Sequence, residues 1–382
     1  METLFYIVCF FPFINWLGIG GNSDIQPYCM IITLLLLIYY SIKRKIVVNR
    51  SIMGFYVLII IGLFMGVVMT LIWDGLALSR SVRYLATYIS LILVSCFTYL
   101  LCRENGGLEE SKIKKIINIY LIVGIIQLFY KNFLYGFIAN PRTTGNRGVI
   151  SLTSEPSFYG YMCIFFLILA LDFKKNRNIY IINLLFQICI LAKSSITMLY
   201  IAIFMFLVIL FSVKKMNMKS FMLILGIIFI GVIIGYYYIT NNSEQRITFF
   251  INTLLSQKSI GDIINRLLRD YSVAVRANDI KVCLVGFAEM FGVPYGFDTR
   301  KISSGYGSLI LTMGWIGVII VSCIFRYCKM SYNGLLKKVL PIFLTIIMFS
   351  AIQVANPVFQ FLIGYFMFLS ERSKLTEENE SR

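Results

Sequence analysis

The segment from residue 142 to residue 157 carries the groups best suited to chemistry. Arg142 and Arg147 lie in it, and Glu155 follows Arg147 by eight residues, within Thr153-Ser-Glu-Pro-Ser157. A guanidinium group donates two parallel hydrogen bonds to phosphate oxygens and does not lose its charge. A neighbouring carboxylate could accept the proton of an attacking hydroxyl group. Together these groups suit the transfer of a sugar from a lipid diphosphate to a hydroxyl group.

Part of this segment also has a purely structural explanation. Ser154 is a residue type that caps helices, Glu155 suits the positive end of a helix dipole, and Pro156 is tolerated in a first turn. A single arginine at a membrane surface more often contacts a lipid headgroup or solvent. Helix capping does not explain Arg142 and Arg147, so both interpretations of Glu155 stay open.

Further arginines lie in other polar segments between apolar runs: Arg80, Arg83, Arg266, Arg269 and Arg276. The last three belong to a long segment, residues 241–305, in which apolar residues recur at helical spacing: Ile263, Ile264, Leu267, Leu268, Tyr271 and Val275. At 100° per residue these side chains share one face, and the three arginines lie on the opposite face. The pattern predicts an amphipathic helix on the membrane surface or over a cavity.

The rest of the sequence is suited to a lipid bilayer. Hydrophobic residues make up 59% of the chain, aromatic residues 15%, and the mean hydropathy is +0.81, outside the range of soluble domains. About twelve apolar runs approach or reach the length that ~30 Å of hydrocarbon requires: residues 4–20, 26–42, 52–73, 84–102, 116–130, 157–173, 179–192, 196–213, 220–240, 306–326, 339–355 and 357–370. Barrel strands would alternate in polarity, and these runs do not. The predicted fold class is an all-α polytopic membrane protein.

The distribution of charge predicts the orientation. The chain has 35 basic and 18 acidic residues, a net charge of +17. With the N-terminus inside, more than half of the basic residues fall in inner segments, and the short outer loops hold few. The positive-inside rule therefore places both termini in the cytoplasm and residues 131–156 and 241–305 outside. Topology explains the charge, so we expect no nucleic-acid partner.

We expect the N-terminal end of the chain to be a membrane span and the C-terminal end to be disordered. Residues 1–20 lack a basic start and a small-residue cleavage site, so the first apolar run is expected to be a span and not a signal peptide. Residues 1–370 are then one membrane domain. The polar residues 371–382 are expected to form a disordered cytoplasmic tail.

Histidine, cysteine and mid-span charge limit the chemistry. The chain has no histidine, which excludes a histidine base, and its nine cysteines include no Cys-x₂-Cys pair, so we expect no metal site. No charged residue lies in the middle of a predicted span, which disfavours an ion-coupled transporter.

Several short tracts together resemble a known family. They are the Arg-Gly…Ser-Glu-Pro-Ser tract, Lys193-Ser-Ser195, the glycine-rich stretch followed by Gly314-Trp-Ile-Gly317, Asn356-Pro357, and Asn22-Ser-Asp-Ile-Gln-Pro27. They look like the O-antigen and capsule repeat-unit polymerases (Wzy type), which are relatives of the O-antigen ligases. The likeness covers most of the chain in topology and these patches in residue identity.

The resemblance implies a GT-C-like membrane glycosyltransferase of the bacterial inner membrane. Such enzymes move a growing glycan from undecaprenyl diphosphate to the non-reducing end of a new lipid-linked repeat unit, without a cofactor. It places Arg147 and Glu155 in the family's Ser-Glu-Pro loop and Arg276 in its long loop, with Arg80 and Arg83 as weaker matches. The ligases typically carry a histidine in the long loop, so its absence here favours a polymerase.

We therefore expect Arg147 and Arg276 to hold the diphosphate and Glu155 to orient or deprotonate the acceptor. The remaining arginines, Arg80, Arg83, Arg142, Arg266 and Arg269, would bind the lipid-linked substrates. The expected partners are undecaprenyl-diphosphate-linked donor and acceptor, membrane lipid and a chain-length regulator protein. A flippase for lipid-linked oligosaccharides, or a ligase-type glycan transferase, stays as the alternative. A flippase is expected to carry charged cavity residues within its spans.

Overall fold

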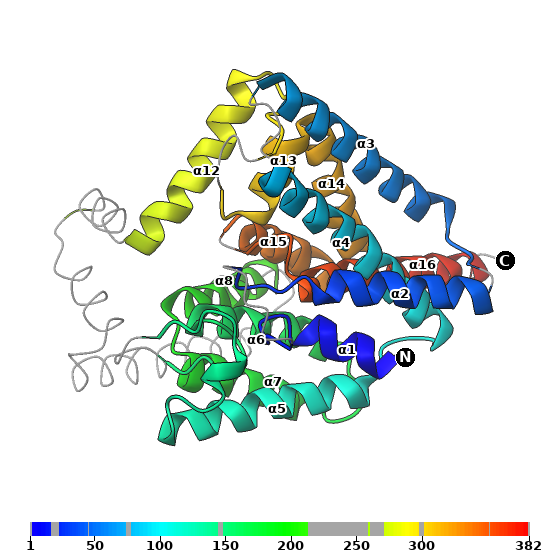
Figure 1. Cartoon of the computed structure of the whole chain (residues 1–382). Coiled ribbons are helices and arrows are strands. Elements are labelled where there is room, and N and C mark those ends of the chain that lie inside the picture. Colours follow the sequence, from blue (N-terminus) through cyan, green and yellow to red (C-terminus); the bar gives the residue numbers. More distant parts are fainter. Residues whose placement is uncertain are drawn as a thin grey trace.

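The apolar runs form helices that pass back and forth between two ends of the molecule (Figure 1). This computed structural model describes residues 2–16, 23–44, 46–73, 78–143, 148–212, 259, 271–297, 302–350 and 352–380. Over these residues the fold is all-helical and contains no β-strand, apart from an isolated antiparallel bridge between Ile14 and Ile138. The all-α prediction is confirmed for this part of the chain.

The helices follow one another in the order α1 (Glu2–Phe10), α2 (Tyr28–Lys43), α3 (Arg50–Trp73), α4 (Leu78–Glu104), α5 (Glu110–Phe129), the short 3₁₀ helix η1 (Tyr135–Phe137), α6 (Pro156–Ala170), α7 (Arg177–Phe186), the π-helix η2 (Gln187–Ala192), α8 (Ser195–Ser212), α12 (Tyr271–Glu289), α13 (Gly305–Met313), α14 (Trp315–Met330), α15 (Leu336–Met348) and α16 (Pro357–Glu380).

Three helices are both long enough and apolar enough to cross a bilayer: α3, the Ser81–Glu104 part of α4, and α8. Three shorter apolar helices accompany them, namely α2, α6 and the continuous pair α7 and η2. An α-helix rises 1.5 Å per residue, so ~20 residues cross ~30 Å of hydrocarbon. Large apolar side chains such as Phe64 of α3 and Phe206 of α8 are exposed, as lipid-facing residues are. These features support a multi-pass helical membrane protein.

Helix α16 forms the centre of the core and packs closely against α4. A Cβ atom on Gly364 would lie only 2.2 Å from the Ser95 carbonyl oxygen, so glycine is what allows the two helices to approach. Nearer the start of α16, Ser90 donates a hydrogen bond of 2.8 Å to Gln360 Oε1. Both of these polar residues are buried. The pairing of α4 and α16 therefore fixes the position of the loop that precedes α16.

We call the end at which α1 begins and α4 ends the terminal face. There Lys112 of α5 pairs with Glu2 of α1 at 2.9 Å. Glu371 of α16 accepts hydrogen bonds from Tyr99 at 2.6 Å and from Asn49 at 3.4 Å. Helix α16 continues to Glu380, whereas we expected disorder after Ser370. The bonds to Glu371 hold the helix beyond the apolar run, and most of the residues that follow are good helix formers.

Two predicted spans are not single helices. Within its described residues, 4–16, the run 4–20 is helical only to Phe10, because Pro12 follows and has no N–H to continue the backbone ladder. The run 306–326 is divided between α13 and α14 at Gly314, whose φ is 58°, a left-handed value that favours glycine. A third predicted span, residues 220–240, lies outside the described residues.

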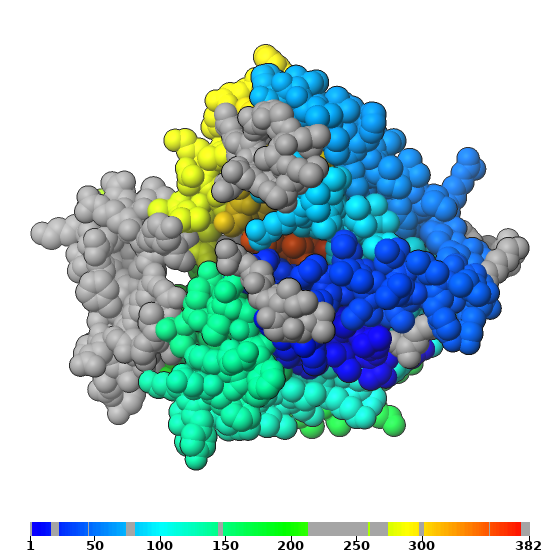
Figure 2. Space-filling model, in the orientation of Figure 1, coloured from blue at the N-terminus to red at the C-terminus, as the bar shows by residue number. Residues whose placement is uncertain are grey.

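The opposite end, at which α6 and α16 begin, is here called the pocket face. Figure 2 shows a hollow at the centre of the visible surface, between blue atoms of the N-terminal region and cyan atoms of α4. Orange atoms of the chain near the end of α15 are visible inside this hollow. The polar segments between the helices meet at this end of the molecule.

Candidate functional site

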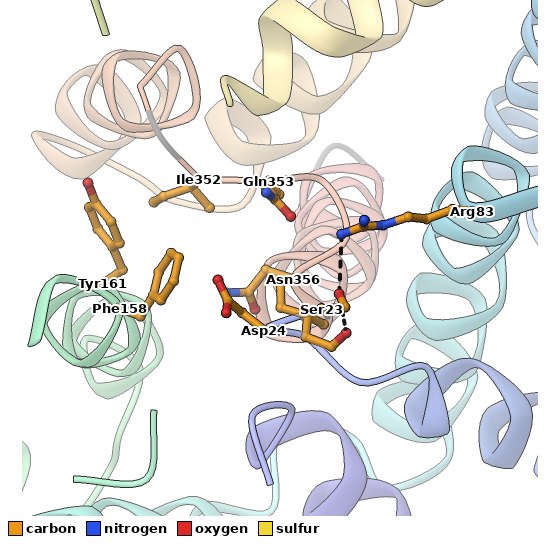
Figure 3. A pocket seen from close by; sticks show the side chains of 9 residues that line it. Ser23, Asp24, Arg83, Phe158, Tyr161, Ile352, Gln353 and Asn356 are labelled. Carbon is orange, nitrogen blue, oxygen red and sulfur yellow. Dashed lines mark hydrogen bonds between the residues drawn. The ribbon is translucent and has the colours of Figure 1, made fainter. Parts of the chain in front are cut away.

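A pocket of about 70 Å³ opens on the pocket face. Its lining comes from four segments that are far apart in the sequence: Ser23, Asp24, Ile25, Arg83, Phe158, Tyr161, Ile352, Gln353 and Asn356 (Figure 3). These residues precede α2, begin α4, begin α6 and precede α16, respectively. Four helix starts therefore share one polar cavity.

Arg83 reaches the pocket from the second turn of α4. Its Nη2 donates a hydrogen bond of 3.3 Å to Ser23 Oγ, and Ser23 Oγ in turn donates to the Ile25 carbonyl oxygen at 2.9 Å (Figure 3). This contact holds the segment before α2 against α4. Arg83 is a predicted substrate-binding residue, and it lies in the pocket lining.

Arg142 connects two carboxylates at the edge of the pocket. Its Nη2 lies 2.5 Å from Asp24 Oδ2 and 3.9 Å from Glu155 Oε2. A backbone hydrogen bond also joins residue 142 to the loop before α6, because the Arg142 N–H donates to the Ser154 carbonyl oxygen at 2.6 Å. The Arg142 side chain is 54% exposed, and exposed ion pairs add only about 0–1 kcal/mol to stability. Stability alone therefore gives little reason for this cluster.

Hydrogen bonds to α5 hold the loop before α6 in place. Gln127 of α5 donates to the Ser151 carbonyl oxygen at 2.9 Å and accepts from the Ser151 N–H at 2.7 Å. Ser151 Oγ also donates to the Tyr120 carbonyl oxygen at 2.7 Å. A buried polar side chain is costly unless it is bonded, and here the bonds position the loop. Gln127 therefore fixes the position, relative to α5, of the loop that carries Glu155.

The beginning of this loop is packed just as tightly. A Cβ atom on Gly148 would lie 2.0 Å from the Ala192 carbonyl oxygen, and the Val149 N–H donates to the Leu191 carbonyl oxygen at 2.9 Å. Residue 148 is thus held against the connection between η2 and α8. Arg147, the residue before it, lies outside the described residues.

Glu155, and not Ser154, occupies the N-cap position of α6. Its φ of −154° and ψ of 160° are extended, and its side chain makes no capping hydrogen bond. The Glu155 carboxylate instead accepts a short hydrogen bond from Ser157 Oγ. The Ser154 hydroxyl is buried and has no hydrogen-bond partner among the described residues. Ser154 was therefore wrongly expected to cap this helix, because the helix begins one residue later than that role requires.

Arg276 approaches the pocket from α12. Its Nη2 lies 3.5 Å from the hydroxyl oxygen of Tyr161, to which it donates, and the ring of Tyr161 lines the pocket. One turn later, Asp279 accepts a hydrogen bond of 3.0 Å from the Ser303 N–H. Burial raises the pKa of the Asp279 carboxyl above its usual value, although Ser303 and Arg276 act in the opposite direction. The contact with Ser303 ties α12 to the segment that begins α13.

Of the eight predicted site residues, Arg83 lines the cavity itself. Arg142 contacts the lining residue Asp24 and, at 3.9 Å, Glu155, and Arg276 contacts the lining residue Tyr161. Arg80 lies in the first turn of α4, but its side chain is not among those described. Arg147, Arg266 and Arg269 lie outside the described residues, as does most of the predicted amphipathic segment; α12 begins at Tyr271. Within the described ranges, no three cysteine or acidic side chains come close enough together to hold a metal ion.

Four polar residues of the pocket lining were not proposed as site residues from the sequence: Ser23, Asp24, Gln353 and Asn356. Asp24 belongs to the Asn22–Pro27 tract, where an acidic residue next to apolar runs is a usable signal. Asn356 precedes a proline, and its Oδ1 accepts a hydrogen bond of 2.9 Å from the Val358 N–H at the start of α16. An asparagine in that place predicts a helix cap, which hides its second role as a pocket residue.

Comparison with models of known protein families, with curated proteins and with solved structures gave no match for this chain.

Proposed function

We propose that this protein is a membrane glycosyltransferase that polymerises lipid-diphosphate-linked oligosaccharide repeat units. The observation that supports this proposal is a pocket at one end of an apolar helical bundle that is lined by Arg83 and Asp24 and contacted by Arg142 and Arg276. These cations and carboxylates, with Glu155 next to Arg142, match a diphosphate and a hydroxyl group.

The proposed reaction joins two lipid-linked glycans. A hydroxyl group of the acceptor repeat unit attacks the anomeric carbon of the donor glycan, and the bond to undecaprenyl diphosphate breaks. Guanidinium groups stabilise the negative charge that develops on the diphosphate, which is the role we assign to Arg276 together with Arg147. A carboxylate of the site accepts the hydroxyl proton. The bilayer edge holds both substrates in reach of each other.

The finer topology belongs to the same proposal. We place the pocket face on the outer side of a bacterial plasma membrane and both termini in the cytoplasm, with about twelve spans in a GT-C-like arrangement. The 35 basic residues and their distribution along the sequence support this orientation. Lipid-linked substrates would then reach the pocket from the outer leaflet, and a chain-length regulator would act from that side.

Deletion of the gene tests the function. A polymerase predicts cells that retain single lipid-linked repeat units on the outer side of the membrane and lose long glycan chains. Single repeats confined to the inner leaflet would instead identify a flippase. Long chains that persist on the lipid carrier but are no longer attached to their final acceptor would identify a ligase-type transferase. The same strain carrying an intact copy of the gene is the control.

A further inference from the structure

Asp24 and Glu155 both contact Arg142, but they differ in their position relative to the pocket. Asp24 lines the pocket, whereas Glu155 is not among the lining residues. Asp24 Oδ2 is bonded to Arg142, and no donor among the described residues contacts Asp24 Oδ1. Glu155 binds Ser157 through one oxygen and lies within 3.9 Å of Arg142 through the other. Asp24 is therefore the carboxylate with an oxygen left for a molecule in the pocket.

The groups around Asp24 suit a sugar ring. No acceptor among the described residues receives a hydrogen bond from Asn356 Nδ2, and the Gln353 side-chain amide forms no hydrogen bond with them either. Amide donors next to a carboxylate acceptor match the alternating donors and acceptors of sugar hydroxyl groups. The aromatic rings of Phe158 and Tyr161 supply the apolar surface that the C–H face of a sugar needs.

The pocket also has a direction. Figure 3 shows Asp24 and Asn356 between the Phe158 ring on one side and Arg83 on the other. A sugar against the aromatic side would bring one hydroxyl group to Asp24. Arg276 contacts the hydroxyl of Tyr161 on this same side. The diphosphate that we assign to Arg276 would therefore lie on the side of the sugar, within reach of the hydroxyl group at Asp24.

We propose that this pocket is the acceptor-sugar subsite and that Asp24, and not Glu155, takes the proton of the attacking hydroxyl group. The inference rests on the proposed function. The acceptor oxygen forms a bond to the donor's anomeric carbon, and the bond from that carbon to the diphosphate oxygen breaks. The electron pair of the broken bond leaves with the diphosphate, and the hydroxyl proton passes to the Asp24 carboxylate. Glu155 is a positioning residue that acts through Arg142.

The test uses the full-length protein in membranes and lipid-diphosphate-linked repeat units extracted from the deletion strain. Asp24→Asn is expected to lower the polymerisation rate by about 10² to 10³, within the range that general acid–base catalysis contributes. The acid limb of the pH–rate profile, where the base becomes protonated, is expected to disappear. Glu155→Gln is expected to lower the rate about tenfold and to retain that limb, because it leaves the base in place.

Two further variants separate chemistry from folding. Arg142→Gln breaks the same ion pair as Asp24→Asn but keeps the Asp24 carboxylate, so a much smaller loss of rate and a retained acid limb are expected. Asp24→Glu keeps a carboxylate and is expected to recover part of the rate. Full activity of Asp24→Asn, or loss of the acid limb in Glu155→Gln alone, would overturn the assignment of Asp24. Equal losses in Asp24→Asn and Arg142→Gln would show that the ion pair, and not the base, matters. In all these outcomes the wild-type protein still makes polymer, whereas failure of the proposed function would leave the wild type inactive.

Discussion

The two ends of the helical bundle use charged residues in different ways. On the terminal face, Lys112 bonds to Glu2 at 2.9 Å and to Glu109 at 2.7 Å, so these three charges meet one another within the protein. On the pocket face, Arg142 holds Asp24 at the edge of an open cavity, and Asp24 retains an oxygen that the described residues do not use. Charges that satisfy one another join helices, and charges around a cavity are available to a ligand.

The largest expected effect follows from removal of Arg276 on the pocket face. Arg276→Ala is expected to lower the polymerisation rate by about 10² to 10³, the usual loss when one preorganised donor is removed from a developing negative charge. The rate is measured in membranes with lipid-linked repeat units, and immunoblotting checks that the protein accumulates. Tyr161→Phe removes the hydroxyl group that accepts from Arg276 and is the matched control, with a loss of less than tenfold. A normal ladder of chain lengths from Arg276→Ala would show that Arg276 is dispensable.

A smaller effect is expected at Asn356, where one atom caps a helix and the other faces the cavity. Asn356→Asp keeps an oxygen for the Val358 N–H but replaces the Nδ2 donor by an acceptor. The apparent KM for the acceptor should rise about tenfold, which corresponds to about 1.4 kcal/mol of lost binding, with kcat changed much less. An unchanged KM in a stable Asn356→Asp protein would remove this residue from the acceptor subsite.

The terminal face should respond in stability and not in activity. Glu371→Gln weakens the hydrogen bonds from Tyr99 and Asn49, and a loss of about 1 kcal/mol in the free energy of unfolding is expected for a partly exposed bond to a charged group. Thermal unfolding in detergent measures this loss, and chain lengths in cells should stay normal. If Glu371→Gln shortened the chains without a change in stability, the contrast between the two faces would not hold.

The smallest expected effect is at Ser154, the residue before Glu155. Its buried hydroxyl has no partner in the described part of the chain, so Ser154→Ala should leave stability unchanged or raise it by up to about 1 kcal/mol. A serine that capped α6 would instead lose about 0.5–2 kcal/mol on the same substitution. Thermal unfolding of Ser154→Ala therefore separates the two roles, and a clear loss of stability would restore the capping role.

The sequence was sufficient to predict that the chain is helical and where the long helices lie, but not how the helices pack against one another. Apolar length alone predicts α3 and α8, because a bilayer imposes that length. It overestimates the length of the first helix, where Pro12 ends the backbone hydrogen-bond pattern, and it misses the break between α13 and α14 at Gly314. Glycine and proline act locally, and an average over a whole run hides them.

The candidate site was predictable only in part for a related reason. Arg142 and Glu155 are close in the sequence, so their meeting could be expected from the loop that contains them. Asp24 and Asn356 are separated by most of the chain, and they meet because α2 and α16, the helices that follow them, both pack against α4. Such contacts depend on how helices pack, and a single sequence does not display that packing.

Polymerisation by the purified protein in lipid vesicles tests the central claim most directly. The vesicles would contain lipid-diphosphate-linked repeat units from the deletion strain, and gel electrophoresis would resolve the glycan products by length. We predict that the wild-type protein converts single repeats into a ladder of longer chains with release of undecaprenyl diphosphate, and that Arg276→Ala does not. If the wild-type protein leaves the repeats single while remaining folded in the vesicles, the pocket face does not join glycans and the account is wrong.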